Sequence, residues 1–212
     1  MYLFYFVTFI SIIGDFIQIR KRYNNHNKTI GVMFMKALVF KGNRITNFTD
    51  YADPTYDENG VIVKVMANGV CRSDYSMWYN ENPPNAEICG HEMTGVVAEV
   101  GKNVKNFKVG DRVLVPFSGS DGTCPHCLEG NTNLCDSFLV PGATFNGGYA
   151  EYLNIPLADR NLLQLPEAIS FLDGAALGCR MMTAFHGMIN RAEVKTGDKV
   201  AIFGCGGIGL SA

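Results

Sequence analysis

The sequence predicts a mostly β, barrel-like domain followed by the start of an α/β domain with a parallel sheet. Short apolar strand patterns recur between residues 35 and 156, and turn dipeptides such as Asp-Pro, Asn-Gly and Pro-Pro separate them. After Pro166 the pattern changes to two helices and then one buried strand that enters a glycine-rich turn.

The elements are expected in the following order. Met35 opens the first strand, and four further strands follow it, at residues 61–67, 95–100, 112–115 and 148–153. Ser170 is expected to cap a helix over residues 171–177, and a second helix is expected over residues 179–191. Residues 199–203 are expected to form a buried strand.

Length and composition suit an ordinary enzyme. The chain has 212 residues, of which 47% are hydrophobic, enough for about one and a half domains. We divide it into an extension at residues 1–34, a β domain at residues 35–165, and linking helices with the first strand of the α/β domain at residues 166–212. A net charge of -2 does not suggest the basic footprint of a nucleic-acid-binding protein.

The seven cysteines suggest metal binding in a reducing compartment. Their number is odd, and three of them form a tight local group in which Cys124 and Cys127 are followed by Cys135. The other four are scattered through apolar or glycine-rich stretches rather than arranged as a disulfide framework. We therefore expect a cytoplasmic protein.

The extension at residues 1–34 contains an apolar run, interrupted by Asp15, and then the basic run at residues 20–22. A signal peptide carries its positive charge before the apolar run, so the pattern does not fit one. We favour a mis-assigned start codon, because Met33 and Met35 stand directly before the first strand. The alternatives are a membrane anchor with a cytoplasmic basic flank and a disordered or targeting extension.

Cys71, His91 and Glu92, with Cys179 far downstream, have side chains that suit a catalytic zinc ion. Catalytic zinc takes three protein ligands and leaves a fourth position open for water or substrate. Two thiolates and a neutral imidazole balance the charge of the divalent ion, which can then stabilise a bound alkoxide. Each residue alone is a weak signal, since an isolated apolar cysteine is usually a core residue.

Three strings contain these residues. They are Gly-Val-Cys-Arg-Ser-Asp at residues 69–74, Gly-His-Glu at residues 90–92, and Leu-Gly-Cys-Arg-Met-Met-Thr-Ala at residues 177–184. In this order they resemble the zinc-binding signatures of the medium-chain, zinc-dependent alcohol dehydrogenase family, and the resemblance runs from about Met35 to Ala212. It implies that Cys71, His91 and Cys179 are the catalytic zinc ligands. It also implies a GroES-like catalytic domain followed by an incomplete Rossmann domain.

The resemblance also implies roles for the neighbours of the three metal ligands. Glu92 would approach the metal when water or substrate exchanges. Asp74 would hold the ligand histidine in one tautomer, although a carboxylate at a helix N-terminus is the plainer interpretation. Ser73 would start a proton relay, with a simple N-cap as its alternative. Many relatives continue the relay through a histidine, where this sequence has Ser76, which cannot hold a proton near neutral pH as imidazole does.

The local cysteine group resembles the structural zinc lobe of the same family. A structural zinc site is closed and four-coordinate, so Cys124, Cys127 and Cys135 need a fourth ligand. The family has a cysteine where this sequence has Asp121. A carboxylate oxygen can replace it, and His126 is the rival ligand. Water, or a lobe without metal, remains the further alternative.

The glycine-rich turn predicts dinucleotide binding. Four glycines follow the last expected strand, namely Gly204, Gly206, Gly207 and Gly209. Such glycines let the backbone approach a pyrophosphate at a helix N-terminus. By resemblance, Arg72 would reach the pyrophosphate and Thr183 the nicotinamide, while Trp78 would line the substrate pocket or simply join the core. The residue that selects NAD or NADP would come later than the printed sequence.

The implied reaction is the reversible transfer of a hydride between a primary or secondary alcohol and NAD or NADP, with zinc lowering the pKa of the bound hydroxyl. The partners would be a small alcohol, aldehyde or ketone, and a full-length form would be a homo-oligomer. We expect the present chain to hold zinc without turnover. The competing hypotheses are a zinc-binding protein without catalysis, a zinc-free quinone reductase, against which the cysteines argue, and a polyol dehydrogenase, against which Cys179 argues.

Overall fold

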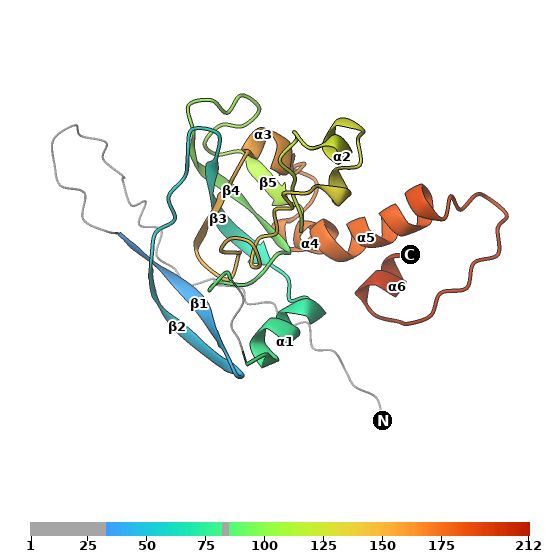
Figure 1. Cartoon of the computed structure of the whole chain (residues 1–212), viewed down its shortest axis with the longest axis horizontal. Coiled ribbons are helices and arrows are strands. Elements are labelled where there is room, and N and C mark those ends of the chain that lie inside the picture. Colours follow the sequence, from blue (N-terminus) through green and yellow to red (C-terminus); the bar gives the residue numbers. More distant parts are fainter. Residues whose placement is uncertain (1–32, 82–84) are drawn as a thin grey trace.

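The computed structural model describes residues 33–81 and 85–212 (Figure 1). Nearly all of the extension at residues 1–34 therefore lies outside the described residues. Within the described part, no helix has both the length and the apolar character needed to cross a membrane.

Two antiparallel sheets make up the first part of the chain. The smaller sheet is the hairpin of β1 (Phe34–Gly42) and β2 (Ile45–Ala52), and the larger has the order β6-β3-β4-β5-β7. Its strands are, along the chain, β3 (Val61–Asn68), β4 (Met93–Val100), β5 (Arg112–Val115), β6 (Tyr152–Ile155) and β7 (Leu163–Gln164). The prediction of a mostly β domain is confirmed, although the sheets do not close into a barrel within the described residues.

The core lies against β3, an inner strand of the larger sheet. Val61, Ile62 and Val63 of β3 are each 0% exposed, so both faces of the strand are covered there. Burying an aliphatic side chain of this size contributes about 1.5–3 kcal/mol. Apolar residues of β4, β5 and β6 complete the same cluster, which fixes the ends of β3 and β4, where the candidate ligands lie.

Strand β2 is not predicted by the sequence pattern. Almost all of its side chains are exposed, so it lacks the alternation that marks a half-buried strand. It forms because β1 is its neighbour along the chain. Asn43 and Arg44 join the two strands with φ of 50° and 64°, as a two-residue hairpin turn with positive φ at both positions requires.

The strand expected at residues 148–153 begins later, at Tyr152. The preceding residues instead pair with the turn that carries His91. The backbone N–H of Gly148 donates to the carbonyl of Gly90 at 3.0 Å, and that of Tyr149 donates to the carbonyl of Cys89 at 3.0 Å. A Cβ on Gly148 would lie 2.8 Å from the end of the Met93 side chain, which would have to move to make room for it.

The two expected helices form one nearly continuous helical segment (Figure 1). It comprises α4 (Phe171–Ala175), a π-helical turn at Leu177–Met181, α5 (Met182–Phe185) and a second π-helical turn at His186–Arg191. The predicted cap is confirmed, since Ser170 Oγ accepts the N–H of Asp173 at 3.0 Å. In the first π turn, the Gly178 carbonyl accepts the N–H of Phe117 at 2.9 Å, which ties the helix to the chain after β5.

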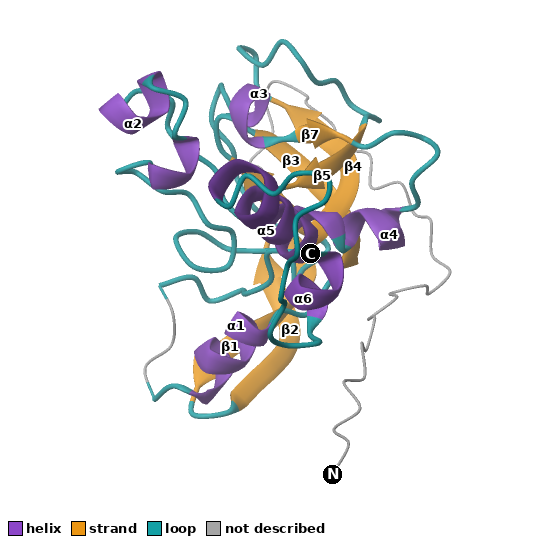
Figure 2. Ribbon diagram, turned by 90° about the vertical axis from the view of Figure 1, so that its right-hand side faces the viewer, coloured by secondary structure: helices purple, strands orange, loops and turns teal. Residues whose placement is uncertain are grey.

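The prediction of a buried strand at residues 199–203 is wrong for this structure. These residues adopt no strand, and Val200, Ile202 and Phe203 are 46%, 47% and 96% exposed. A strand exists only when a neighbour pairs with its backbone, and no described segment pairs with this one. The chain then turns back into the short helix α6 (Gly207–Ser211), which packs beside the π turn at Leu177–Met181 (Figure 2).

Candidate metal centre and its surroundings

Cys71, His91, Glu92 and Cys179 meet in one cluster. Their donor atoms all lie within 4.8 Å of one another. Three separate segments supply them: Cys71 precedes α1 (Arg72–Tyr79), His91 and Glu92 precede β4, and Cys179 lies in the first π turn. His91 and Glu92 are 4% and 1% exposed, whereas Cys71 and Cys179 are half-buried, so the cluster is buried on one side.

The donor set fits a zinc ion. Atoms bound to one tetrahedral zinc at 2.0–2.3 Å lie roughly 3.3–3.8 Å apart, so the observed spread needs only small adjustments. Thiolate and imidazole are donors that zinc prefers. The buried Nδ1 of His91 lacks a well-formed hydrogen bond, and Asp74 Oδ1 is 3.5 Å from it. A carboxylate on Nδ1 leaves Nε2 for a metal.

Asp74 is held in this position by two further bonds. Its Oδ2 accepts the backbone N–H of Cys71 at 2.8 Å and the hydroxyl of Tyr149 at 2.7 Å. Burial raises the pKa of Asp74, while the charge of His91 and the hydroxyl of Tyr149 oppose this change. Tyr149 is 75 residues away in sequence, and sequence reasoning missed it because nothing local marks it as a partner.

The protonation of the metal-free cluster shows strong coupling. Hydrogen bonds from Cys179 and His91 lower the pKa of Cys71 to about 2. The same bond, together with burial, raises the pKa of Cys179. Burial lowers the pKa of His91, but the Cys71 thiolate and Asp74 outweigh it, so the net pKa is raised. In the metal-free cluster, protons on Cys179 and His91 therefore stabilise the Cys71 thiolate, as a bound metal cation would do in their place.

The residues of α1 lie beside the cluster. Ser73 Oγ is 3.4 Å from His91 Nε2, so its hydroxyl is within reach of the candidate metal position. Ser76 Oγ donates to the Ser73 carbonyl at 2.7 Å. The Arg72 guanidinium lies over the ring of Tyr75. The Trp78 ring packs against the same ring, with 5.5 Å between the ring centroids.

The glycine-rich turn is compact. Gly204 has φ of +110°, a conformation that side chains rarely adopt. A Cβ on Gly209 would collide with the Gly204 carbonyl, and a Cβ on Gly207 would lie 2.7 Å from Arg180 Cδ, whereas Gly206 faces open space. Thr183, four residues after Cys179, is exposed.

A second group of donors lies in a lobe that projects from the sheets (Figure 2). Donor atoms of Asp121, Cys124, Cys127 and Cys135 all lie within 4.8 Å of one another, and His126 is not among them. The lobe contains α2 (Pro125–Leu128) and a 3-10 turn at Thr132–Leu134. Proline at the first helical position and Cys124 before it set the local geometry.

Asp121 points into this group. Its Oδ1 lies 3.5 Å from Cys127 Sγ and 3.4 Å from Cys135 Sγ, and it accepts the N–H of Thr123 at 2.9 Å. That backbone bond, with help from Cys135, lowers the pKa of Asp121. Burial raises the pKa of Cys135 to about 11. The geometry therefore favours Asp121 over His126 as the fourth donor.

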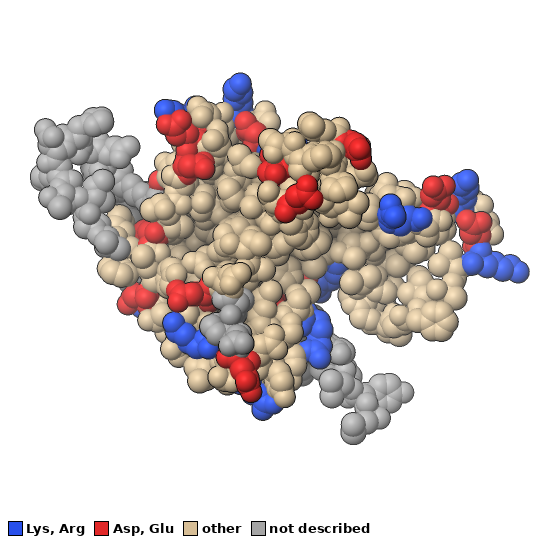
Figure 3. Space-filling view, viewed as in Figure 1, with Lys and Arg blue, Asp and Glu red and all other residues tan. Residues whose placement is uncertain are grey.

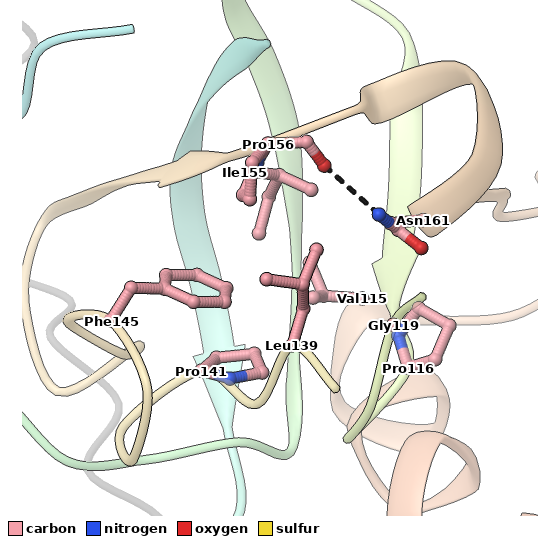
Figure 4. Close-up of a pocket in the computed structure, with 9 residues that line it drawn as sticks. All are labelled: Val115, Pro116, Gly119, Leu139, Pro141, Phe145, Ile155, Pro156 and Asn161. Atoms are coloured by element: carbon pink, nitrogen blue, oxygen red, sulfur yellow. Dashed lines mark hydrogen bonds between the residues drawn. The ribbon is translucent and has the colours of Figure 1, made fainter. Parts of the chain in front are cut away.

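A small apolar pocket lies apart from both groups (Figure 4). It is formed where β5 and β6 end, beside α3 (Ala158–Asn161), and Phe145 and Leu139 close one side. Asn161 Nδ2 donates to the Pro156 carbonyl at 3.1 Å across its edge. None of the candidate ligands lines this pocket.

Comparison with known families gives a clear assignment. Residues 57–167 match the family model described as alcohol dehydrogenase GroES-like domain, which is more than half of the chain. The chain belongs to the zinc-dependent, medium-chain alcohol dehydrogenase family, as the three sequence strings imply. The expected GroES-like fold agrees with this match.

Individual relatives support the same family. An uncharacterized zinc-type alcohol dehydrogenase-like protein of Escherichia coli (strain K12) is 35% identical over 191 residues, which are 84% of this chain and 53% of the relative. An alcohol dehydrogenase of Geobacillus stearothermophilus is 36% identical over 180 residues, covering 83% of this chain and 50% of the relative. The chain thus spans about half the length of the curated relatives it matches.

Solved structures show the same relation. The alcohol dehydrogenase of Thermus sp. ATN1 has a TM-score of 0.78 and 30% identity, and the match covers 84% of this chain and 53% of that one. An Escherichia coli CFT073 alcohol dehydrogenase complexed with NADH has a TM-score of 0.76 and 30% identity, covering 85% of this chain and 52% of that one.

Proposed function

We propose that Cys71, His91 and Cys179 bind a catalytic zinc ion and that the whole protein is an NAD(P)-dependent alcohol dehydrogenase. The single observation that carries this proposal is the convergence of the three donors, with Asp74 placed on the far nitrogen of the imidazole. When bound, zinc supplies Lewis-acid chemistry and the nicotinamide accepts or gives the hydride. The substrate class is a small primary or secondary alcohol or the corresponding carbonyl compound.

The residues of the chain would hold the reactants and move the proton. Ser73 Oγ, beside His91 Nε2, is the hydroxyl that would take the proton of the alcohol. The Ser76 hydroxyl donates to a carbonyl and, unlike imidazole, cannot hold a proton near neutral pH. We therefore propose that the proton then leaves through water. Arg72, Thr183 and the glycine-rich turn would bind the dinucleotide.

We further propose a structural zinc ion in the lobe, with Asp121 as the fourth ligand beside three thiolates. The family's general properties suggest a cytoplasmic homo-oligomer. Acidic and basic side chains lie among one another on the face drawn in Figure 3.

The Cys71→Ser substitution tests the catalytic zinc assignment. It removes one thiolate of the three-ligand site, so the purified chain should lose about one equivalent of tightly bound zinc. Native mass spectrometry measures the stoichiometry, and Cys205→Ser, which changes an exposed cysteine outside both groups, is the matched control. Equal zinc content in Cys71→Ser and in the unchanged chain would refute the assignment.

A further inference from the structure

Arg180 forms an ion pair inside the candidate zinc cluster. Its Nη2 donates to Oε2 of Glu92, which is 88 residues away. The Glu92 side chain is 1% exposed and that of Arg180 is 24% exposed, so water screens this pair only weakly. Gly69 makes room for it, since a Cβ there would overlap Glu92 and lie 3.2 Å from Arg180 Nη2.

The charges of the cluster explain why this pair matters. Two thiolates balance a divalent zinc ion, so the carboxylate of Glu92 adds a negative charge beyond that balance, besides the charge of Asp74 against His91. A buried carboxylate needs a cation or a metal beside it. Arg180 supplies the cation, and its guanidinium does not lose its proton in proteins. Glu92 therefore has two competing partners, the arginine and the metal.

The stem of Arg180 is fixed from the other side. A Cβ on Gly207 would lie 2.7 Å from Arg180 Cδ, so the glycine-rich turn packs directly against the methylene groups of the arginine. The same side chain thus contacts the metal cluster at its tip and the expected dinucleotide-binding turn along its stem. This packing limits the positions that the guanidinium can adopt, and in the observed position its Nη2 faces Glu92.

We propose that Arg180 is a positioning residue that holds Glu92 away from the metal and so keeps one coordination position open for substrate. This inference rests on the zinc ligands proposed above. Without the guanidinium, Glu92 would bind the metal as a fourth protein ligand, and the site would acquire the closed character of a structural site.

Cobalt substitution tests this role without requiring catalytic turnover. The metal-free chain is loaded with Co²⁺ and titrated with imidazole, which can bind only where a coordination position is open. The visible spectrum of the unchanged chain should shift. In Arg180→Met the shift should need at least about tenfold more imidazole, a change of the size seen when groups around a metal site are altered. Cobalt in the lobe is common to all variants and cancels in the comparison.

The double variant Arg180→Met with Glu92→Gln decides whether Arg180 acts through Glu92. An amide is a poor replacement for the carboxylate ligand, so the double variant should regain the imidazole response of the unchanged chain. Arg180→Lys keeps the positive charge but lacks the planar guanidinium, so its imidazole response should lie between those of the unchanged chain and Arg180→Met. Circular dichroism checks the folding of each variant, and if Arg180→Met does not fold, Arg180→Lys alone decides the question.

Two results would overturn the proposal: a cobalt-loaded Arg180→Met with an unchanged imidazole response, or a double variant that stays as unresponsive as Arg180→Met. If Arg180→Lys must decide, a response equal to that of the unchanged chain counts against the proposal. Failure of the underlying zinc assignment looks different, because Cys71→Ser would then bind as much cobalt as the unchanged chain.

Discussion

The two candidate metal groups are assembled in opposite ways. The lobe takes Asp121, Cys124, Cys127 and Cys135 from fifteen consecutive residues, and Figure 2 shows it apart from the sheets. The catalytic candidate takes its donors from segments as far apart as Cys71 and Cys179, and buries two of them, His91 and Glu92, at the start of β4. The first group depends on local spacing, whereas the second depends on the whole domain being folded.

The difference predicts how each group responds to change. A local loop can be adjusted one ligand at a time, because few other contacts constrain it. The buried cluster is supported by three hydrogen bonds. Asp74 accepts the N–H of Cys71 and the hydroxyl of Tyr149, and Arg180 donates to Glu92. A change in that support should propagate to the metal, and the following experiments compare the two groups on this point.

The largest effect in this comparison is expected from Asp74→Asn. The amide cannot supply the negative charge that faces His91 Nδ1 at 3.5 Å and orients the ring. Zinc affinity at the buried cluster should fall about 10–100-fold, while the lobe, which lacks contact with Asp74, should keep its metal. Chelator competition resolves the two sites by their release rates. A uniform loss from both sites would show general unfolding instead of a local effect.

The next effect concerns the fourth lobe ligand. Asp121→Cys should tighten zinc binding, since a fourth thiolate gives a softer and fully closed site. Asp121→Ala should loosen it, because the carboxylate between Cys127 and Cys135 disappears. The same chelator assay measures both changes, and His126→Ala is the control that should leave release unchanged. Identical release from all Asp121 variants would exclude the carboxylate as a ligand.

The pH dependence of stability should become steeper with metal. In the metal-free chain the raised pKa of His91 makes its stabilising contribution fall as pH rises above the ordinary value of about 6.5, whereas the lowered pKa of Cys71 makes the contribution of that thiolate rise, so the two oppose each other. Zinc instead requires the deprotonated ligands, so the loaded cluster should gain stability over the same range. Urea unfolding between about pH 6 and pH 8, with and without zinc, measures both slopes. Parallel slopes would contradict the assignment of His91 as a ligand.

The smallest effect is expected from Tyr149→Phe. It removes one hydroxyl donor to Asp74, leaves the ring stacked on Phe40, and keeps the carboxylate with its bond from the Cys71 N–H. Zinc affinity at the buried cluster should fall by less than with Asp74→Asn, and the lobe should not respond. Calorimetric zinc titration of both variants ranks them, and a larger loss with Tyr149→Phe would reverse the order of support proposed here.

Much of the candidate site was predictable because its signals are local. A Gly-His-Glu turn, a Cys-x2-Cys-x7-Cys loop and a glycine-rich turn are each short strings whose residue types carry the chemistry. The helix cap at Ser170 was predictable for the same reason, since a hydroxyl and an N–H three residues later are close in any helix start. Strand β2 was not predictable, because it lacks the alternation of apolar and polar residues that marks a strand in a sequence. Its backbone pairing with β1 stabilises it instead.

The sequence by itself therefore determined which side chains can act: the thiols, the imidazole, the carboxylates and the flexible glycines. Only the tertiary structure decided which of them meet. The Arg180–Glu92 pair and the Tyr149–Asp74 bond join residues 88 and 75 positions apart, and no local pattern encodes such distances. The missing strand at residues 199–203 has the same cause, because an apolar segment becomes a strand only when another strand supplies partners for its backbone.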